Sequence, residues 1–139
     1  MMMRSVLSPR VLISMASLGL ALQYGHAHAY ETSLRPQFER LEPDTRLEEV
    51  CDTEVALRLN REQRGLAVDK VVSYTFRQVI QEKNNKIVAN GAAFRSRGKW
   101  YHLKFECQTG PKHMDVHMLT YTAGAEIPRS QWARHYLYD

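Results

Sequence analysis

The chain has 139 residues, of which 24% are charged and 44% hydrophobic, with a formal net charge of +4. A single domain accounts for this length. Arg4 and Arg10 lie in a predicted export signal, and their removal lowers the charge to about +2. Such a charge is ordinary for a folded domain, so composition does not indicate a nucleic-acid-binding protein.

The first 29 residues have the pattern of a signal peptide. Arg4 and Arg10 precede an apolar run at residues 11–22, which is shorter than the roughly 20 residues that a membrane-spanning helix needs. Small residues follow, and we expect cleavage after Ala29, with Ala27 as the alternative. An uncleaved anchor is the other interpretation of this segment. We expect an exported protein, periplasmic or secreted, without a transmembrane segment after signal cleavage.

The mature chain is predicted to begin with an arm and a helix. Residues 30–43 are polar, contain two prolines and read as an arm. Asp44 is a candidate helix N-cap for a helix over residues 45–62, and Gly65 is its expected stop. A break near Asp52, which would then cap a second short helix, is the alternative.

The segment after Gly65 changes to β-strand character. Residues 68–76 are rich in β-branched and aromatic side chains, with residues 79–80 as a possible continuation after a kink. Residues 82–86 read as a turn, and residues 87–89 begin the next strand.

A hairpin over residues 91–107 is the clearest local prediction. Arg97 and Gly98 suit a tight turn, with Gly98 at a positive φ. That turn pairs Ser96 with Lys99, Arg95 with Trp100, Phe94 with Tyr101 and Ala92 with Leu103. The core face then carries Phe94, Tyr101, Leu103, Phe105 and Cys107, and the opposite face carries Arg95, Trp100, His102, Lys104 and Glu106.

The last third of the chain predicts one more strand and a short helix. Residues 115–122 have apolar side chains on both faces, so the strand is either central or covered by the chain end, and Gly124 ends it. Residues 129–138 are predicted to form a helix whose Trp132 and Tyr136 dock on the sheet. The expected fold class is α+β: an N-terminal helical segment packed on an antiparallel sheet of about four strands, a short C-terminal helix and one disulfide, in a single domain over residues 44–139.

Two cysteines remain in the exported part of the chain. We expect Cys51 and Cys107 to form a disulfide, because paired thiols in an exported domain are usually bridged. They lack the Cys-x-x-Cys spacing of redox-active pairs. Because Cys107 lies on the core face of the hairpin, the bridge should clamp the helix onto the sheet.

The hairpin tip is the best candidate binding site. Arg95, Arg97, Lys99 and Trp100 would offer three cations and an aromatic ring to a phosphate, a carboxylate or a polyanionic glycan. Arg95 opposite Trp100 also suits cation–π stacking, and an exposed Trp100 could stack on a sugar or base. The alternative is a solvated turn that an Arg–Trp pair merely stabilises.

Two other groups of polar residues were considered as metal or catalytic sites. His113, Asp115 and His117 alternate and would share a strand face, but no further ligands cluster near them, so we expect no metal site. The acidic residues Glu48, Glu49, Asp52 and Glu54 are explained by their place early in a helix. No catalytic motif is present, and we expect neither a cofactor nor an enzymatic activity.

Three stretches carry a family resemblance. They are residues 41–52 (LEPDTRLEEVCD), residues 91–107 with the string FRSRGKWY, and Ile127-Pro128 with Trp132. The chain resembles an alphaproteobacterial envelope family of unknown function, the domain family numbered nine hundred and thirty. The resemblance implies an exported domain and no particular mechanism. Some relatives carry a membrane anchor and a proline-rich spacer, and this chain has neither after its signal.

The sequence therefore predicts a non-catalytic envelope or secreted binding module whose partner is an envelope component or a protein. The alternative is a small enzyme inhibitor similar to lysozyme inhibitors, or a hydrolase. Neither the partner nor the oligomeric state follows from the sequence.

Overall fold

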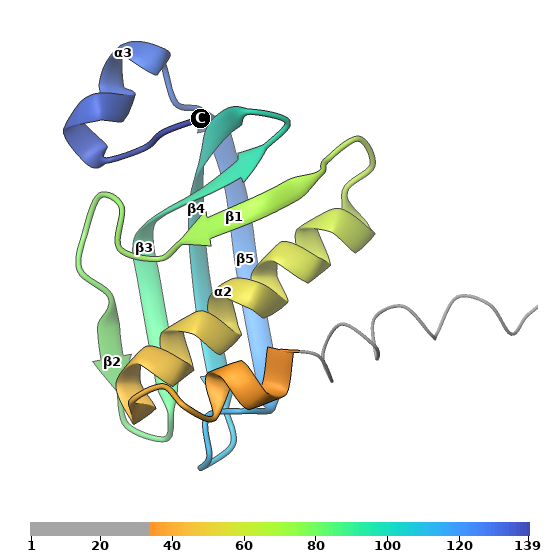
Figure 1. The fold of residues 1–139 in the computed structure, drawn as a ribbon, viewed down its shortest axis with the longest axis vertical. Helices are drawn as coiled ribbons and strands as arrows, with labels where there is room; N and C mark the ends of the chain where they lie inside the picture. Colours follow the sequence, from red (N-terminus) through yellow and green to blue (C-terminus); the bar gives the residue numbers. More distant parts are fainter. Residues whose placement is uncertain (1–33) are drawn as a thin grey trace, which may run out of the picture.

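The computed structural model describes residues 34–139, so the predicted signal peptide and the start of the arm lie outside the described residues. A long helix, α2 (Pro43–Glu62), crosses one face of an antiparallel sheet (Figure 1). The strands are β1 (Val68–Val72), β2 (Ile80–Glu82), β3 (Lys86–Ser96), β4 (Lys99–Thr109) and β5 (Val116–Glu126). A short helix, α3 (Arg129–Trp132), and a 3₁₀ turn, η1 (Ala133–His135), complete the chain. The predicted α+β class is confirmed.

The sheet is built around β3 and β4. Its order is β1-β3-β4-β5, and β2 also pairs with β3, so β1 and β2 occupy successive lengths of the same β3 edge. The strand β5 lies at the opposite edge of the order, so it is not central, and the chain end packs on Ala93 of β3 and Trp100 of β4. It also continues through Gly124 to Glu126, beyond the predicted end.

The hairpin between β3 and β4 has the predicted register. Ser96 pairs with Lys99, Arg95 with Trp100, Phe94 with Tyr101 and Ala92 with Leu103. Further along, the register shifts between Ala89 and Ala92, so that Asn90 and Gly91 form a bulge. At this bulge the N–H of Phe76 donates to the carbonyl of Gly91 at 2.7 Å. A Cβ at Gly91 would lie 2.5 Å from the backbone nitrogen of Arg77, so the close approach requires glycine.

Helix α2 starts earlier than predicted and does not break. Its N-cap residue is Glu42, and Pro43 occupies the first turn, where a missing N–H costs nothing. The predicted cap, Asp44, is therefore a first-turn acid. Asp52 lies within the continuous helix and faces inward, 8% exposed. The helix ends at Glu62, and Gly65, at φ +86°, lies in the following turn.

The first strand is also shorter than predicted. It ends at Val72, and the chain turns at Ser73 instead of continuing to Phe76. Ser73 is completely buried against α2, where its N–H donates to Asp52 at 3.3 Å. The chain re-enters the sheet as β2, so the continuation at Ile80 pairs with β3 rather than extending β1.

Two apolar clusters hold the domain together. The larger lies between α2 and the sheet and includes Val55, Leu59, Phe94 and Phe105. The smaller lies under the C-terminal segment, called the cap (residues 127–138), and is formed by Ala93, Trp100, Ile127, Trp132 and Leu137. The cap sits at the end of the sheet where the β3–β4 turn lies (Figure 1).

The disulfide joins the two layers of the larger cluster. Cys51 and Cys107 are bonded and both are fully buried. Cys107 pairs with Ile87 on β3 and with Leu119 on β5, so it lies in the middle of the sheet. The predicted bridge, and its clamping of α2 onto the sheet, are confirmed. Its presence is consistent with an oxidising compartment.

Residues 34–41, the described part of the predicted arm before Glu42, pack against the helix. Arg46 holds them in place: its guanidinium donates to the carbonyls of Phe38 at 3.0 Å, Glu39 at 3.1 Å and Leu41 at 2.8 Å. It also reaches the carbonyl of Lys112 at 3.3 Å. One side chain thus ties the end of the predicted arm to α2 and to the β4–β5 loop.

Candidate functional site

The hairpin tip is a tight turn in which both central residues have positive φ. Arg97 has φ +52° and Gly98 has φ +73°, the combination of a type I′ turn. This turn matches the twist of paired strands, which explains why the predicted register holds. Arg97 is exposed at the tip of the turn. The other three candidate residues, Arg95, Lys99 and Trp100, contact other parts of the chain.

Arg95 is engaged inside the domain. Its Nε donates to Asp69 Oδ1 at 3.0 Å and its Nη2 to Asp69 Oδ2 at 2.8 Å, a bidentate ion pair between β3 and β1. A third donor reaches the carbonyl of Tyr138 at 3.3 Å. The hydrogen bonds from Arg95 lower the pKa of Asp69, which keeps the carboxylate charged. The guanidinium also lies 5.8 Å from the centre of the Trp100 ring, as the sequence predicted.

Trp100 is not exposed, in contrast to the expectation of a stacking surface. Its side chain is 2% exposed, beneath the cap, and its Nε1 donates to the carbonyl of Tyr138 at 2.8 Å. The face assignment from strand alternation was correct. The burial comes from residues 127–138, which fold back over that face. Trp132 docks as predicted, but the predicted helix over 129–138 ends at Trp132 and Tyr136 projects outward, 81% exposed.

Lys99 also has a partner. Its Nζ lies 3.1 Å from Glu126 Oε2, across the β4–β5 pair, and both side chains are about half exposed. An exposed ion pair of this kind contributes little stability and opens at little cost. Of the four predicted site residues, Arg95 and Trp100 are therefore engaged by other parts of the domain, Lys99 is paired at the surface, and Arg97 has no ion-pair partner among residues 34–139.

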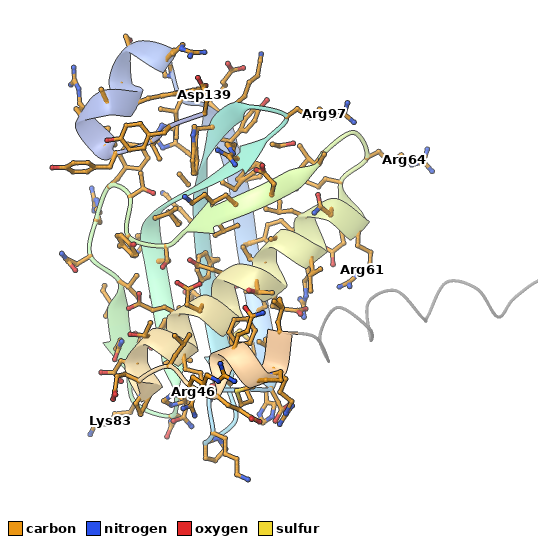
Figure 2. The ribbon with its side chains drawn as sticks, viewed as in Figure 1. Arg46, Arg61, Arg64, Lys83, Arg97 and Asp139 are labelled. Atoms are coloured by element: carbon orange, nitrogen blue, oxygen red, sulfur yellow. A yellow bond between two sulfur atoms is a disulfide. The ribbon has the colours of Figure 1, made fainter. Side chains whose placement is uncertain are left out.

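Two arginines that the sequence analysis passed over lie on the same edge as Arg97. Figure 2 shows Arg61 and Arg64 projecting outward there, from the end of α2 and from the turn that follows it. The turn is fixed beside the hairpin because the N–H of Ala67 donates to Ser96 Oγ at 2.9 Å. We call Arg61, Arg64 and Arg97 the basic edge. Neither Arg61 nor Arg64 forms an ion pair with any residue in the described part of the chain.

The predicted histidine cluster does not converge. His113 bridges two loops, with Nδ1 2.7 Å from the carbonyl of Pro43 and Nε2 3.1 Å from Asn85 Oδ1. Asp115 lies near Arg35 at 3.6 Å, and His117 packs over Gly110. Among residues 34–139 no group of three or more His, Cys, Asp or Glu side chains is arranged to hold a metal ion.

The acidic cluster separates into residues with different surroundings. Glu54 pairs with Arg58 at 3.1 Å. Burial raises the pKa of Glu48, and burial raises the pKa of Asp52 to about 8. The neighbouring charge of Glu49 raises the pKa of Asp52 further, against the hydrogen bond from Ser73. The sequence signal for Asp52 is an acid three residues after Glu49 and beside a core cysteine; its place early in the helix does not predict its burial, and the alternative of a helix break at Asp52 is wrong.

Two surface cavities accompany these residues. One, of about 200 Å³, lies along α2 and is lined by Leu34, Phe38, Val50, Leu57 and Arg61 among others. The other, of about 280 Å³, lies between α2 and β1 and is lined by Glu49, Asp52, Asp69, Lys70 and Tyr74 among others. No helix within residues 34–139 combines the length and the apolar character that a membrane crossing requires.

The fold and site define a small disulfide-linked α+β domain with one helix across an antiparallel sheet and a basic edge that runs from the end of α2 to the hairpin tip. The chain belongs to the family described as Domain of Unknown Function DUF930, whose family model matches residues 38–137. The resemblance seen in the sequence is thereby confirmed. No curated protein and no solved structure matches the chain significantly.

Proposed function

We propose that this protein is an exported, non-catalytic binding domain that holds an anionic component of the cell envelope on its basic edge. Three observations support this proposal. The arginines of the basic edge project from one side of the domain (Figure 2), none has an ion-pair partner among the described residues, and the disulfide suits an oxidising compartment. The partner bears phosphate or carboxylate groups, which guanidinium groups bind bidentately.

The conformation of Arg97 is the observation that carries the proposal. At φ +52° a side chain other than Gly, Asn or Asp is disfavoured, at a cost of about 1 kcal/mol or more. The preferred pair for this turn is Asn-Gly, so the turn itself does not explain an arginine. An arginine at the strained tip presents its charge as far from the sheet as the hairpin allows, where a large partner can reach it.

The test separates binding from folding through the choice of substitution. The variant Arg61→Gln, Arg64→Gln, Arg97→Asn removes three charges and supplies the residue that the turn prefers. We expect unchanged or higher thermal stability, together with about a tenfold weaker association with a purified envelope fraction, measured by co-sedimentation at low salt. Tenfold corresponds to about 1.4 kcal/mol of binding free energy.

A matched control removes the same charge elsewhere. Lys83, at the opposite end of the domain in Figure 2, is replaced by Gln together with Lys104 and Lys112, all exposed. This control should bind as the parent protein does. Equal losses in both variants would indicate only nonspecific attraction between charges, and no loss in the first variant would refute the proposal.

A further inference from the structure

The cavity along α2 is lined mainly by apolar side chains that the two apolar clusters do not account for. Leu34 and Phe38 line it from the segment before α2, which lies beside the helix in Figure 1, and Leu57 lines it from α2 itself. These side chains are half-buried, and neither cluster includes them. The remaining apolar lining residues are Val50, Met114 and Val116. Apolar side chains gathered around one hollow, unlike scattered ones, mark a surface that contacts a ligand or a partner.

The shape of the cavity suits part of an alkyl chain. Its volume of about 200 Å³ exceeds the roughly 150 Å³ of an apolar cavity that admits benzene. Val50 and Leu57 are about two helical turns apart, so they lie on one side of α2. Arg61, which also lines the cavity, is about one turn further along the same side. A chain that lies along this side of the helix therefore ends beside a guanidinium group.

The charges around the cavity leave that guanidinium available. Glu54 lines the cavity but pairs with Arg58 at 3.1 Å. Arg35 also lines it, and its Nη1 lies 3.6 Å from Asp115 Oδ1. Arg61 is exposed and forms no ion pair with any residue among 34–139. Because Arg61 is part of the basic edge as well, the apolar cavity and the basic edge meet at this side chain (Figure 2).

We propose that the anionic component held on the basic edge is an envelope lipid, with an acyl chain in the cavity and a phosphate or carboxylate group at Arg61. This inference rests on the proposed function, since it names the partner of the same edge. An apolar pocket with a few polar groups that fix orientation is the usual form of a small-ligand site. Burial of an alkyl chain raises affinity by about fourfold per methylene group, which surface cations alone do not supply. Arg64 and Arg97 then bind further anionic groups of the lipid.

Isothermal titration calorimetry of the full exported protein with alkyl phosphates, kept below their micellar concentrations, tests the proposal. Octyl phosphate carries a tail and an anion, octyl glucoside carries the same tail without charge, and inorganic phosphate is the anion alone. We expect octyl phosphate to bind at least about tenfold more tightly than either control. From butyl to octyl phosphate the affinity should rise by up to about fourfold per methylene. Amide NMR shifts should concentrate at Val50, Leu57 and Met114.

A matched pair of substitutions at Leu57 separates the cavity from folding. Leu57→Gln keeps the helix propensity but places an amide in the apolar lining, so it should weaken octyl phosphate binding about tenfold with an unchanged circular dichroism spectrum. Leu57→Met keeps the lining apolar and should bind as the parent protein does. Arg61→Gln, at an exposed position that folding does not depend on, should remove the preference for octyl phosphate over octyl glucoside. Arg134→Gln, exposed on the cap, is its control and should change nothing.

Several results would overturn the proposal. They are absence of octyl phosphate binding, equal affinities for octyl phosphate and octyl glucoside, and equal binding by the parent protein and a folded Leu57→Gln variant. A dimer in sedimentation experiments that Leu57→Gln dissociates would assign the cavity to a second copy of the chain and would also refute the lipid.

The envelope co-sedimentation assay distinguishes this failure from failure of the proposed function. If the triple variant of the basic edge loses association and Leu57→Gln keeps it, the basic edge binds an anion without an acyl chain, and only the lipid is refuted. If octyl phosphate enters the cavity and the triple variant still associates with the envelope, the proposed function is refuted and the cavity site stands. We expect both variants to lose association.

Discussion

Replacing Asp52 by Asn should change how the stability of the protein depends on pH. In the folded state burial and the charge of Glu49 raise the pKa of Asp52 from 3.8 to about 8. Between these values the folded protein keeps a proton that the unfolded chain has lost. The unfolded state therefore binds fewer protons, and the free energy of unfolding falls as pH rises. The stabilising effect is complete below pH 4 and is lost by about pH 8.

The slope follows from one proton. Full protonation in the folded state and full ionisation in the unfolded state give about 1.4 kcal/mol of lost stability per pH unit. Between pH 5 and pH 7 the parent protein should therefore lose about 3 kcal/mol more than Asp52→Asn does. Since total stabilities of small domains are about 5–15 kcal/mol, such a difference is readily measured.

Urea denaturation at pH 5, 6, 7 and 8, followed by circular dichroism, provides the comparison. The relevant quantity is the difference between the two pH profiles, because contributions from the histidines and the other carboxylates cancel in it. Any constant effect of the Asn side chain also cancels. Parallel profiles for the two proteins over this range would show that Asp52 is ionised in the folded state and would refute the reasoning.

Three other predictions concern the layers of the domain. Replacing Cys51 and Cys107 by Ala should lower the free energy of unfolding by about 4 kcal/mol in the chain-entropy model, as measured by urea denaturation, since the bridge spans 56 residues. Gly91→Ala should cost about 1–3 kcal/mol on the same assay, because its Cβ would meet the backbone of Arg77 at 2.5 Å. Trp100→Ala should cost about 3–5 kcal/mol and loosen the cap, detected as faster proteolysis after residue 126.

Each of these has an outcome that contradicts it. If the variant with both cysteines replaced by Ala is as stable as the bridged protein, the disulfide does not stabilise the packing of α2 on the sheet. Gly91 has no positive φ, so the expected loss comes from steric contact alone, and a Gly91→Ala variant as stable as the parent protein would refute the clash with Arg77. If the Trp100→Ala variant is cleaved after residue 126 at the parent rate, the Trp100 side chain does not hold the cap in place.

Local patterns predicted the parts of the fold that depend on neighbours in sequence. The register from Ala92 to Leu103 follows from a two-residue turn and alternation, and both act over a few residues. The disulfide itself was predicted from two cysteines in an exported chain, and the alternation added that Cys107 points inward, so that the bridge clamps the helix onto the sheet. The bulge at Asn90 and Gly91 escaped prediction because its cause is the close approach of Arg77, from a loop whose path the sequence does not specify.

The candidate site was predicted only in part, for a related reason. Alternation placed Trp100 on the outer face of the hairpin, but burial there depends on Ile127 and Leu137 folding back from the far end of the chain. Likewise the ion pair of Arg95 depends on Asp69 in another strand. The burial of Asp52 was not predicted. The sequence places this acid within a helix but does not show that the turn at Ser73 packs against it.

The two apolar clusters can be followed separately during unfolding by two spectroscopic signals. The chain has two tryptophans, and both Trp100 and Trp132 belong to the cluster under the cap, whereas α2 packs on the other cluster and supplies most of the helical signal. Tryptophan fluorescence therefore follows release of the cap, and far-ultraviolet circular dichroism follows the helix. Coincident transitions would show that both layers unfold as one cooperative unit, and separated transitions would reveal a state in which the cap is open over an intact helix and sheet.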